Sequence, residues 1–241
     1  MGTVAIFPST VGYHWEELFD PFRLFKEAGW NILFFTVEGK QPVADPNSVQ
    51  ERPFLSWMGL GVRKSFSPDT QLGQELLSQL NNHVLTIEQL DISTIDAIYI
   101  PGGHGCLFDV NVNHVVHEKI LQAYQNQKII SAVCHGTSCL AFVKDNNEAI
   151  IKDKEIIGFL DGMDSFLMAL GLVDQRFLPM PYRNEKAMKD AGANITWLHK
   201  LAASINPAYM VVDLPFVTGV GPKAAAKVAQ KVIDLAKAKS E

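Results

Sequence analysis

A cysteine stands at the corner between a predicted strand and a predicted helix. The strand, residues 129–133, ends directly before Cys134, and Gly136 follows two positions later. In α/β proteins a nucleophile elbow of this kind holds its side chain on a sharp turn, while the first amides of the helix point towards the group that is attacked. Cys134 is therefore the candidate nucleophile. The alternative is a buried thiol that packs as a small hydrophobic residue.

Position alone does not make a thiol a strong nucleophile. A free thiol has a pKa of about 8.5, so only a few per cent of it is thiolate near neutral pH. Here the backbone amides of His135, Gly136 and Thr137 would open the predicted helix beside the sulfur and would favour a negative charge there. We therefore expect the pKa of Cys134 to lie below its ordinary value.

A glycine-rich turn, Pro101-Gly-Gly-His-Gly-Cys106, follows the predicted strand at 97–100. Ligands of open α/β sheets bind at the carboxyl ends of the strands. If the amide of Gly103 faces the sulfur together with the amide of His135, the two form an oxyanion hole for a tetrahedral adduct, in which each donor is worth about 3 kcal/mol. The alternative is an ordinary turn after a strand.

Two acids, Glu16 and Glu17, open the predicted helix that follows the first strand. A carboxyl group buried beside a thiolate would have a raised pKa, keep its proton and donate a hydrogen bond to the sulfur. Taken alone, the residues favour a simpler arrangement, in which both acids are solvated and stabilise the helix N-terminus.

His135 follows the candidate nucleophile directly. Adjacent residues on a helix point in different directions, so contact between the imidazole and the sulfur does not follow from the sequence. To act as a base, the imidazole needs an orienting acid. Asp161 and Asp164, after the predicted strand at 155–159, are the candidates. The alternative for His135 is a core histidine whose hydrogen bonds are satisfied.

A further pair of histidines, His114 and His117, lies three residues apart on a predicted helix, with Glu118 adjacent. This spacing matches no zincin motif, which needs glutamate and histidine at other positions. We predict a solvated helix face there and no metal site.

Short β-rich runs alternate along the chain with helix-like segments, which predicts an α/β fold with a parallel sheet. The predicted strands are residues 3–8, 31–36, 97–100, 129–133, 155–159, 195–198 and 210–212. The predicted helices are residues 15–28, 68–80, 114–126, 165–170, 185–191 and 222–239, with one more after Cys134. Ser67 is the expected N-cap of the second helix, with Pro68 in its first turn.

The chain has 241 residues, of which 47% are hydrophobic, and this is enough for one large core. We therefore expect a single domain, residues 1–241, with a loop insertion at about 37–66 near the site. The apolar residues at 54–60 of this insertion fit no clean period. Long loops of this kind often serve as lids or binding segments, and the alternatives are packing under the loop or in a dimer contact.

Composition also limits which kinds of partner and which cellular compartment we expect. The net charge is −5 and the basic residues are scattered, so we expect no nucleic acid partner. Three cysteines form no paired framework and no charged leader precedes the first strand, which indicates a reducing, cytoplasmic protein. No apolar stretch approaches the roughly 20 residues of a membrane-spanning helix.

Taken in order along the chain, these segments resemble the ThiJ/PfpI superfamily, and within it the heat-inducible chaperone and glyoxalase III branch. The segments that carry the resemblance are Gly12…Glu17…Pro21-Phe22, Pro42-Val-Ala-Asp45-Pro46-Asn-Ser48, Asp96…Pro101-Gly-Gly-His-Gly-Cys-Leu-Phe-Asp109, Ala132-Val-Cys134-His-Gly and Val217-Thr-Gly-Val-Gly-Pro222. The resemblance implies a doubly wound, mostly parallel sheet flanked by helices, flavodoxin-like and glutamine amidotransferase-like, with a nucleophile elbow.

The resemblance also implies a role for each candidate. Cys134 would be the nucleophile, and Glu17 rather than Glu16 its protonated partner, which reverses the expectation from the residues alone. The amides of Gly103 and His135 would form the oxyanion hole.

The acid of the triad would be Asp164, where close relatives in this branch often carry glutamate, so the reach to the imidazole is one methylene shorter here. A second departure is Gly221, which stands where relatives commonly have asparagine.

The activity implied by the resemblance is that of a cofactor-independent, homodimeric enzyme of the glyoxalase III type. Such an enzyme converts methylglyoxal or a related 2-oxoaldehyde to a 2-hydroxy acid without glutathione. One alternative is a stress-response holdase, in which residues 54–60 bind unfolded clients and Cys134 senses oxidation. Another is a cysteine amidase, peptidase or protein deglycase that uses the same thiol.

Overall fold

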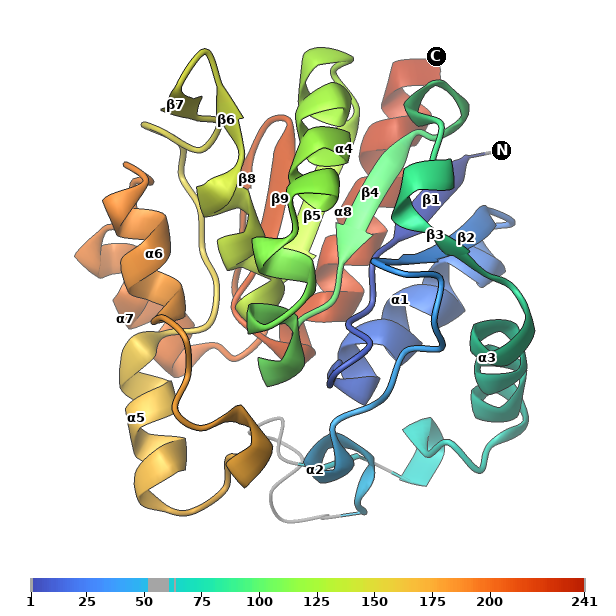
Figure 1. The fold of residues 1–241 in the computed structure, drawn as a ribbon, viewed down its shortest axis with the longest axis horizontal. Coiled ribbons are helices and arrows are strands. Elements are labelled where there is room, and N and C mark those ends of the chain that lie inside the picture. The colour runs from blue at the N-terminus through green and yellow to red at the C-terminus, as the bar shows by residue number, and fades with distance from the viewer. Residues whose placement is uncertain (1, 52–60, 63, 241) are drawn as a thin grey trace.

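A seven-stranded sheet forms the centre of the computed structural model, which describes residues 2–51, 61, 62 and 64–240 (Figure 1). The strand order is β3-β2-β1-β4-β5-β9-β8. The strands are β1 (Thr3–Ile6), β2 (Asn31–Thr36), β3 (Val84–Thr86), β4 (Ala97–Ile100), β5 (Ile129–Val133), β8 (Met210–Asp213) and β9 (Phe216–Gly219). Neighbouring strands are parallel except at the edge, where β8 is antiparallel to β9.

Helices cover both faces of this sheet (Figure 1). The helices are α1 (Trp15–Glu27), α2 (Pro46–Val49), α3 (Gln71–Asn82), α4 (His114–Gln125), α5 (Asp161–Ala169), α6 (Asn184–Asp190), α7 (Trp197–Ile205) and α8 (Pro222–Ser240). One core lies between the sheet and α1, α3 and α8. A second core lies between the opposite face and α4, α6 and α7. The predicted doubly wound α/β fold with a mostly parallel sheet is confirmed.

The two cores explain why the central strands could be recognised. Ile129 and Val133 of β5 face the core of α1 and α8, whereas Ile130 and Ala132 face the core of α4. Successive side chains of a strand point to opposite faces, so a strand between two helical layers is apolar throughout. The predicted strands at 31–36, 97–100 and 129–133 accordingly match the observed boundaries.

The strand predicted at 155–159 is absent, since this segment has no regular secondary structure and pairs with no strand. The backbone N–H of Glu155 donates to Oδ2 of Asp213 at 3.0 Å, and that of Ile157 donates to Oγ1 of Thr218 at 3.1 Å. Side chains of β8 and β9 thus take the place of the backbone carbonyls that a strand pairing would use.

The strand predicted at 195–198 is also wrong, because these residues lead into α7. The hydroxyl of Thr196 accepts a hydrogen bond from the backbone N–H of His199 at 3.2 Å and caps the helix. Similarly, α3 begins three residues later than predicted. Thr70 is its N-cap, while Ser67 and Pro68 form the preceding turn. In both places a threonine hydroxyl satisfies the first amides of the helix.

The insertion predicted at about 37–66 contains the short helix α2. Its apolar residues 54–60 lie outside the described residues. Neither β3 nor the small hairpin of β6 (Lys144–Asp145) and β7 (Glu148–Ala149) was predicted, since such short strands carry almost no alternation. Within the described ranges, no helix combines the length and the apolar character that crossing a bilayer requires.

Candidate active site

Cys134 follows β5 and begins a 3₁₀ helix, Cys134–Phe142, where the sequence predicted an ordinary helix. Its φ angle is +55°, a left-handed conformation that costs a non-glycine residue on the order of 1–3 kcal/mol and is concentrated at functional sites. Gly136 permits this turn, because a Cβ atom there would lie 2.8 Å from the carbonyl oxygens of Ile100 and Pro101. Cys134 is 4% exposed and faces a small cavity.

Glu17 lies beside Cys134, and Gly102 allows the close approach. The backbone N–H of Gly102 donates to Oε2 of Glu17 at 2.7 Å. A Cβ atom on Gly102 would lie 2.7 Å from both Oε2 of Glu17 and Cβ of Cys134. The hydroxyl of Tyr99 donates a hydrogen bond to the carbonyl oxygen of Glu17 at 2.7 Å, which anchors the first turn of α1 to β4.

Neither acid at the start of α1 is solvated, so the arrangement favoured by the residues alone is wrong. Glu16 and Glu17 are both fully buried. Oε1 of Glu16 accepts a hydrogen bond from Nζ of Lys223 at 2.7 Å, which ties α1 to the start of α8. Glu17 instead points towards the sulfur of Cys134, within hydrogen-bonding reach.

The expected low pKa of Cys134 is not found. Burial raises the pKa of the Cys134 thiol, and the adjacent carboxyl of Glu17 raises it further, outweighing the backbone amide of His135 that points at the sulfur. Burial likewise raises the pKa of Glu17, against the opposing effect of His14 and the hydrogen bonds from Cys134 and Gly102. Two adjacent buried groups do not both ionise. The pair therefore carries at most one negative charge.

His135 contacts the sulfur despite being its neighbour in the chain. Its Nδ1 atom is 3.3 Å from Sγ of Cys134, and its Nε2 atom is 3.0 Å from Oδ2 and 3.1 Å from Oδ1 of Asp164. Asp164, in the first turn of α5, is fully buried. Burial alone would raise its pKa, but the facing imidazoles of His135 and His104 hold the pKa of Asp164 well below its ordinary value.

The shorter side chain of Asp164 thus reaches the imidazole, and the other candidate acid has a different task. Asp161 accepts hydrogen bonds from the backbone N–H of Glu185 at 2.9 Å and of Lys186 at 3.1 Å, at the start of α6. The structure therefore joins Cys134, His135 and Asp164 in one hydrogen-bonded chain and leaves Asp161 outside it.

His104 is a site residue that the sequence analysis did not single out. Its Nε2 atom is 3.3 Å from Oδ1 of Asp164, and its Nδ1 atom is 3.9 Å from Oδ2 of Asp45. Burial would lower the pKa of His104, but the two carboxylates outweigh burial and raise it to about 9. His104 is therefore positively charged at neutral pH. The only signal in the sequence was an imidazole inside the glycine-rich turn.

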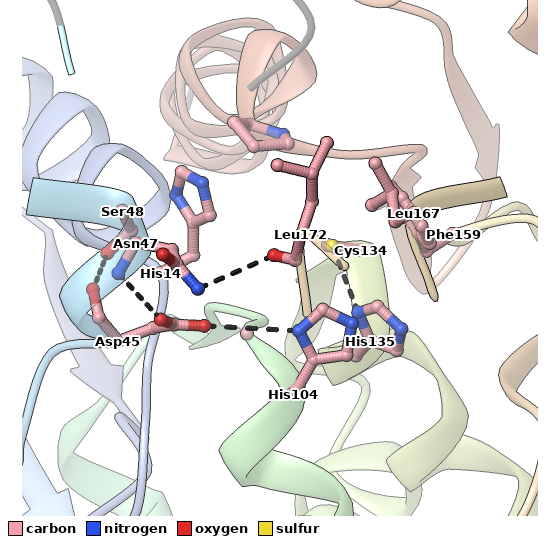
Figure 2. Close-up of a pocket in the computed structure, with 12 residues that line it drawn as sticks. His14, Asp45, Asn47, Ser48, His104, Cys134, His135, Phe159, Leu167 and Leu172 are labelled. Carbon is pink, nitrogen blue, oxygen red and sulfur yellow. Dashed lines mark hydrogen bonds and ion pairs between the residues drawn. The ribbon is translucent and has the colours of Figure 1, made fainter. Parts of the chain in front are cut away.

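The cavity beside Cys134 has two unlike walls (Figure 2). The polar wall comes from the segment between β1 and α1 and from α2, and is formed by His14, Asp45, Asn47 and Ser48. The apolar wall is formed by Phe159, Leu167 and Leu172. Asn47 of one wall donates to the carbonyl oxygen of Leu172 of the other at 3.4 Å. The cavity is small, with a volume of about 50 Å³, which suits a molecule of a few carbon atoms.

Gly103 and Cys134 line the same cavity. Its φ angle is +107°, which favours glycine because other residues rarely adopt it. The backbone amide of His135 points at the sulfur from the other side. The structure thus brings both predicted oxyanion residues to the nucleophile.

Only one group of described side chains has the spacing of metal ligands, namely His104, His135 and Asp164, whose donor atoms lie within 4.8 Å of one another. The three groups are hydrogen-bonded to one another, with Asp164 between the two imidazoles. His117 donates one hydrogen bond from Nε2 to the carbonyl oxygen of Asn111 at 2.8 Å and stacks on Phe142, so it is not the fully solvated side chain that was predicted.

Comparison with known sequences gives one family and a consistent set of relatives. The family model described as "ThiJ/PfpI family-like" matches residues 9–190. Glutathione-independent glyoxalase hsp3102 of Schizosaccharomyces pombe is 25% identical over 228 residues, which cover 92% of this chain and 88% of that protein. Glyoxalase 3 of Candida albicans is 27% identical over 223 residues, which cover 90% of this chain and 86% of that protein.

Solved structures share the fold over the whole length. Rapid Encystment Protein 24 KDa of Francisella tularensis superposes with a TM-score of 0.76 at 25% identity, over 98% of this chain and 99% of the other. Glyoxalase III of Candida albicans superposes with a TM-score of 0.69 at 22% identity, over 97% of this chain and 96% of the other.

Proposed function

The chain belongs to the ThiJ/PfpI-like family, and from this premise we propose that it is a glyoxalase III-type enzyme that converts methylglyoxal or a related 2-oxoaldehyde to the 2-hydroxy acid without glutathione. The observation that carries the proposal is the hydrogen-bonded chain from Cys134 through His135 to Asp164, with the buried carboxyl of Glu17 beside the sulfur. Relatives that span most of the chain are named glutathione-independent glyoxalases, which supports the same activity.

The first step is addition of the Cys134 sulfur to the aldehyde carbon, C1. The thiol proton passes to Nδ1 of His135, 3.3 Å away, and the resulting imidazolium is stabilised by Asp164. The aldehyde oxygen becomes an alkoxide, for which the amides of Gly103 and His135 are the proposed donors. His135 then returns its proton to this oxygen, which gives a neutral hemithioacetal.

The second step moves hydrogen between the two carbons. Glu17, as a carboxylate, takes the proton from C1, and the electron pair of that C–H bond forms a C1=C2 double bond while the C2 oxygen becomes an enediolate oxygen. The same proton returns from Glu17 to C2, and the proton of the C1 hydroxyl passes to the C2 oxygen. C1 becomes the carbonyl carbon of a thioester, and C2 carries the hydroxyl group. Water then adds to the thioester with assistance from His135, which releases the 2-hydroxy acid and restores the thiol. The sum is one oxoaldehyde plus one water giving one hydroxy acid, so no external oxidant is consumed.

The direct test is formation of D-lactate from methylglyoxal by the purified protein with no glutathione present. We expect stoichiometric lactate, measured with a D-lactate dehydrogenase assay. Loss of methylglyoxal without lactate would point to simple adduct formation and would contradict the proposal. Absence of lactate together with cleavage of amide substrates would favour the amidase or peptidase alternative.

A specificity prediction follows from the apolar wall. Leu172 lines the cavity, so Leu172→Ala should enlarge the space beside the substrate's carbon chain and raise the ratio of kcat/KM for phenylglyoxal over methylglyoxal by about tenfold, the usual scale for a few methylenes in an apolar pocket. Leu170→Ala is the matched control, since Leu170 is 54% exposed and lies outside the cavity. An unchanged ratio in the Leu172 variant would show that this wall does not contact substrate.

A second candidate function has an observation of its own. Large apolar side chains are exposed along α5 and α7, namely Phe166, Leu170, Trp197, Leu198, Leu201 and Ile205. Where such side chains form one contiguous patch, they mark a protein-binding surface. They support the holdase alternative or a homodimer contact, and measurements of client aggregation and of oligomeric state separate the two.

A further inference from the structure

His104 is held between two carboxylates that are far apart in the sequence. It is 3.3 Å from Asp164 and 3.9 Å from Asp45, measured between nitrogen and oxygen, and Figure 2 shows the ring facing Asp45 across the cavity floor. The ring stacks on Phe177 with a centroid distance of 5.9 Å. Only 13% of the side chain is exposed. Its position is therefore fixed from three sides.

Asp164 is shared between two imidazoles. Its Oδ1 atom faces Nε2 of both His104 and His135, at 3.3 and 3.1 Å, and its Oδ2 atom faces His135 alone at 3.0 Å. The two imidazole rings lie 4.5 Å apart. A carboxylate that already balances one positive charge stabilises a second one less, and two positive charges at this distance repel each other.

We propose that His104 is a positioning residue that keeps His135 neutral. It does so by contacting Oδ1 of Asp164, which it shares with His135, and by placing a positive charge beside the His135 ring. The inference rests on the proposed function for one point, that His135 accepts the thiol proton. A neutral His135 that donates its Nε2–H to Asp164 presents the lone pair of Nδ1 to the sulfur, whereas a protonated His135 has no lone pair to offer.

His104 keeps its positive charge over the pH range of the proposed test. Because the pKa of His104 is about 9, it stays protonated at neutral and mildly acidic pH. The other titratable groups that act on these rings, or on the groups the rings contact, are His14, Glu17, Asp45, Cys134, Asp164 and Asp174. A substitution at His104 leaves all of them in place.

The test is His104→Gln, which keeps a hydrogen-bond donor but removes the charge. We expect the pKa of His135, followed by NMR of its imidazole, to rise by about one unit or more. The acid limb of kcat/KM should move with it, which gives about a tenfold loss on the acid side and little loss on the alkaline side. A purely structural defect would lower kcat/KM equally at every pH.

Two further variants sharpen the result. His104→Lys restores a positive charge between the carboxylates and should return the acid limb towards the wild-type position. His199→Gln is the control, because His199 is a partly buried histidine of α7 whose ring lies beside that of Tyr209. Its loss should leave the pH profile of kcat/KM unchanged.

Asp45→Asn keeps the inference testable if His104→Gln does not fold. Removing one of the two carboxylates should lower the pKa of His104, measured by NMR in the same way. An unmoved His135 pKa in a folded His104→Gln protein, or an unmoved His104 pKa in Asp45→Asn, overturns the inference. Because the NMR titrations need no turnover, the expected shifts in a protein that forms no lactate would support the inference while the proposed function fails.

Discussion

Cys134→Ser should reduce the formation of lactate from methylglyoxal by about 10⁴-fold or more. A serine hydroxyl fits the same left-handed turn but ionises far less readily than a thiol, and it cannot form the thioester through which the proposed reaction passes. The measurement is kcat/KM with a D-lactate readout, on protein whose fold is checked by circular dichroism.

Cys139→Ser is the matched control for that substitution. Cys139 is fully buried, and its thiol donates to the carbonyl oxygen of Val110 at 3.7 Å, in the core on the α4 side of the sheet. Its loss should leave turnover near the wild-type value. Suppression of client aggregation, if present, should survive Cys134→Ser, because the apolar face of α5 and α7 is unchanged. Substantial lactate formation by the Cys134 variant would eliminate the covalent mechanism.

Glu17→Gln should lower kcat/KM by about 10²- to 10⁴-fold, the usual contribution of a positioned acid or base. Glutamine keeps an oxygen that accepts the Gly102 amide hydrogen bond but cannot move a proton between the two carbons. The same substitution should stabilise the protein at alkaline pH, because it removes a buried carboxyl whose ionisation the fold opposes.

The pH dependence of that stability has a definite sign. The pKa of Glu17 is raised by burial, so its protonated form favours the folded state fully below the ordinary pKa of 4.5, and this contribution is lost as the pH rises through the raised value. The gain of Glu17→Gln over wild type, measured by urea unfolding, should therefore be larger at pH 8 than at pH 5.

Glu16→Gln provides the contrast, since Glu16 pairs with Lys223 and does not face the sulfur. Removing this partner of a mostly buried ammonium group should destabilise the protein and leave kcat/KM close to wild type. A Glu17 variant with normal turnover would refute the proton transfer assigned to this carboxyl.

The fold could be predicted from the sequence wherever burial dictates residue type. The strand at 129–133 is apolar at every position because helices cover both of its faces. The prediction of a strand at 195–198 was wrong. The strand preference of its β-branched residues is outweighed by one hydrogen bond, from the amide of His199 to the hydroxyl of Thr196, which caps α7. Local capping of this kind cannot be weighed from composition.

The site was predictable only in part, for a different reason. The turn around Cys134 is a local pattern, so the candidate nucleophile could be found from its neighbours. The environment of His104 is not local, since it requires Asp45 and Asp164 to arrive from segments on either side in the sequence. The raised pKa of Cys134 likewise depends on the inward orientation of Glu17, which helix position alone did not determine.

The polar and apolar sides of the cavity belong to separate stretches of the chain, the first to residues 14–48 and the second to residues 159–172. The hydrogen bond from Asn47 to the carbonyl oxygen of Leu172 links the two sides through the backbone of Leu172, so it does not depend on which apolar side chains line the second stretch. A protein engineer could diversify Leu167 and Leu172 as one library to change substrate scope, and keep Phe159, whose ring centroid lies 4.8 Å from that of His135. The same separation offers natural variation a route to new carbonyl substrates at little risk to the chemistry.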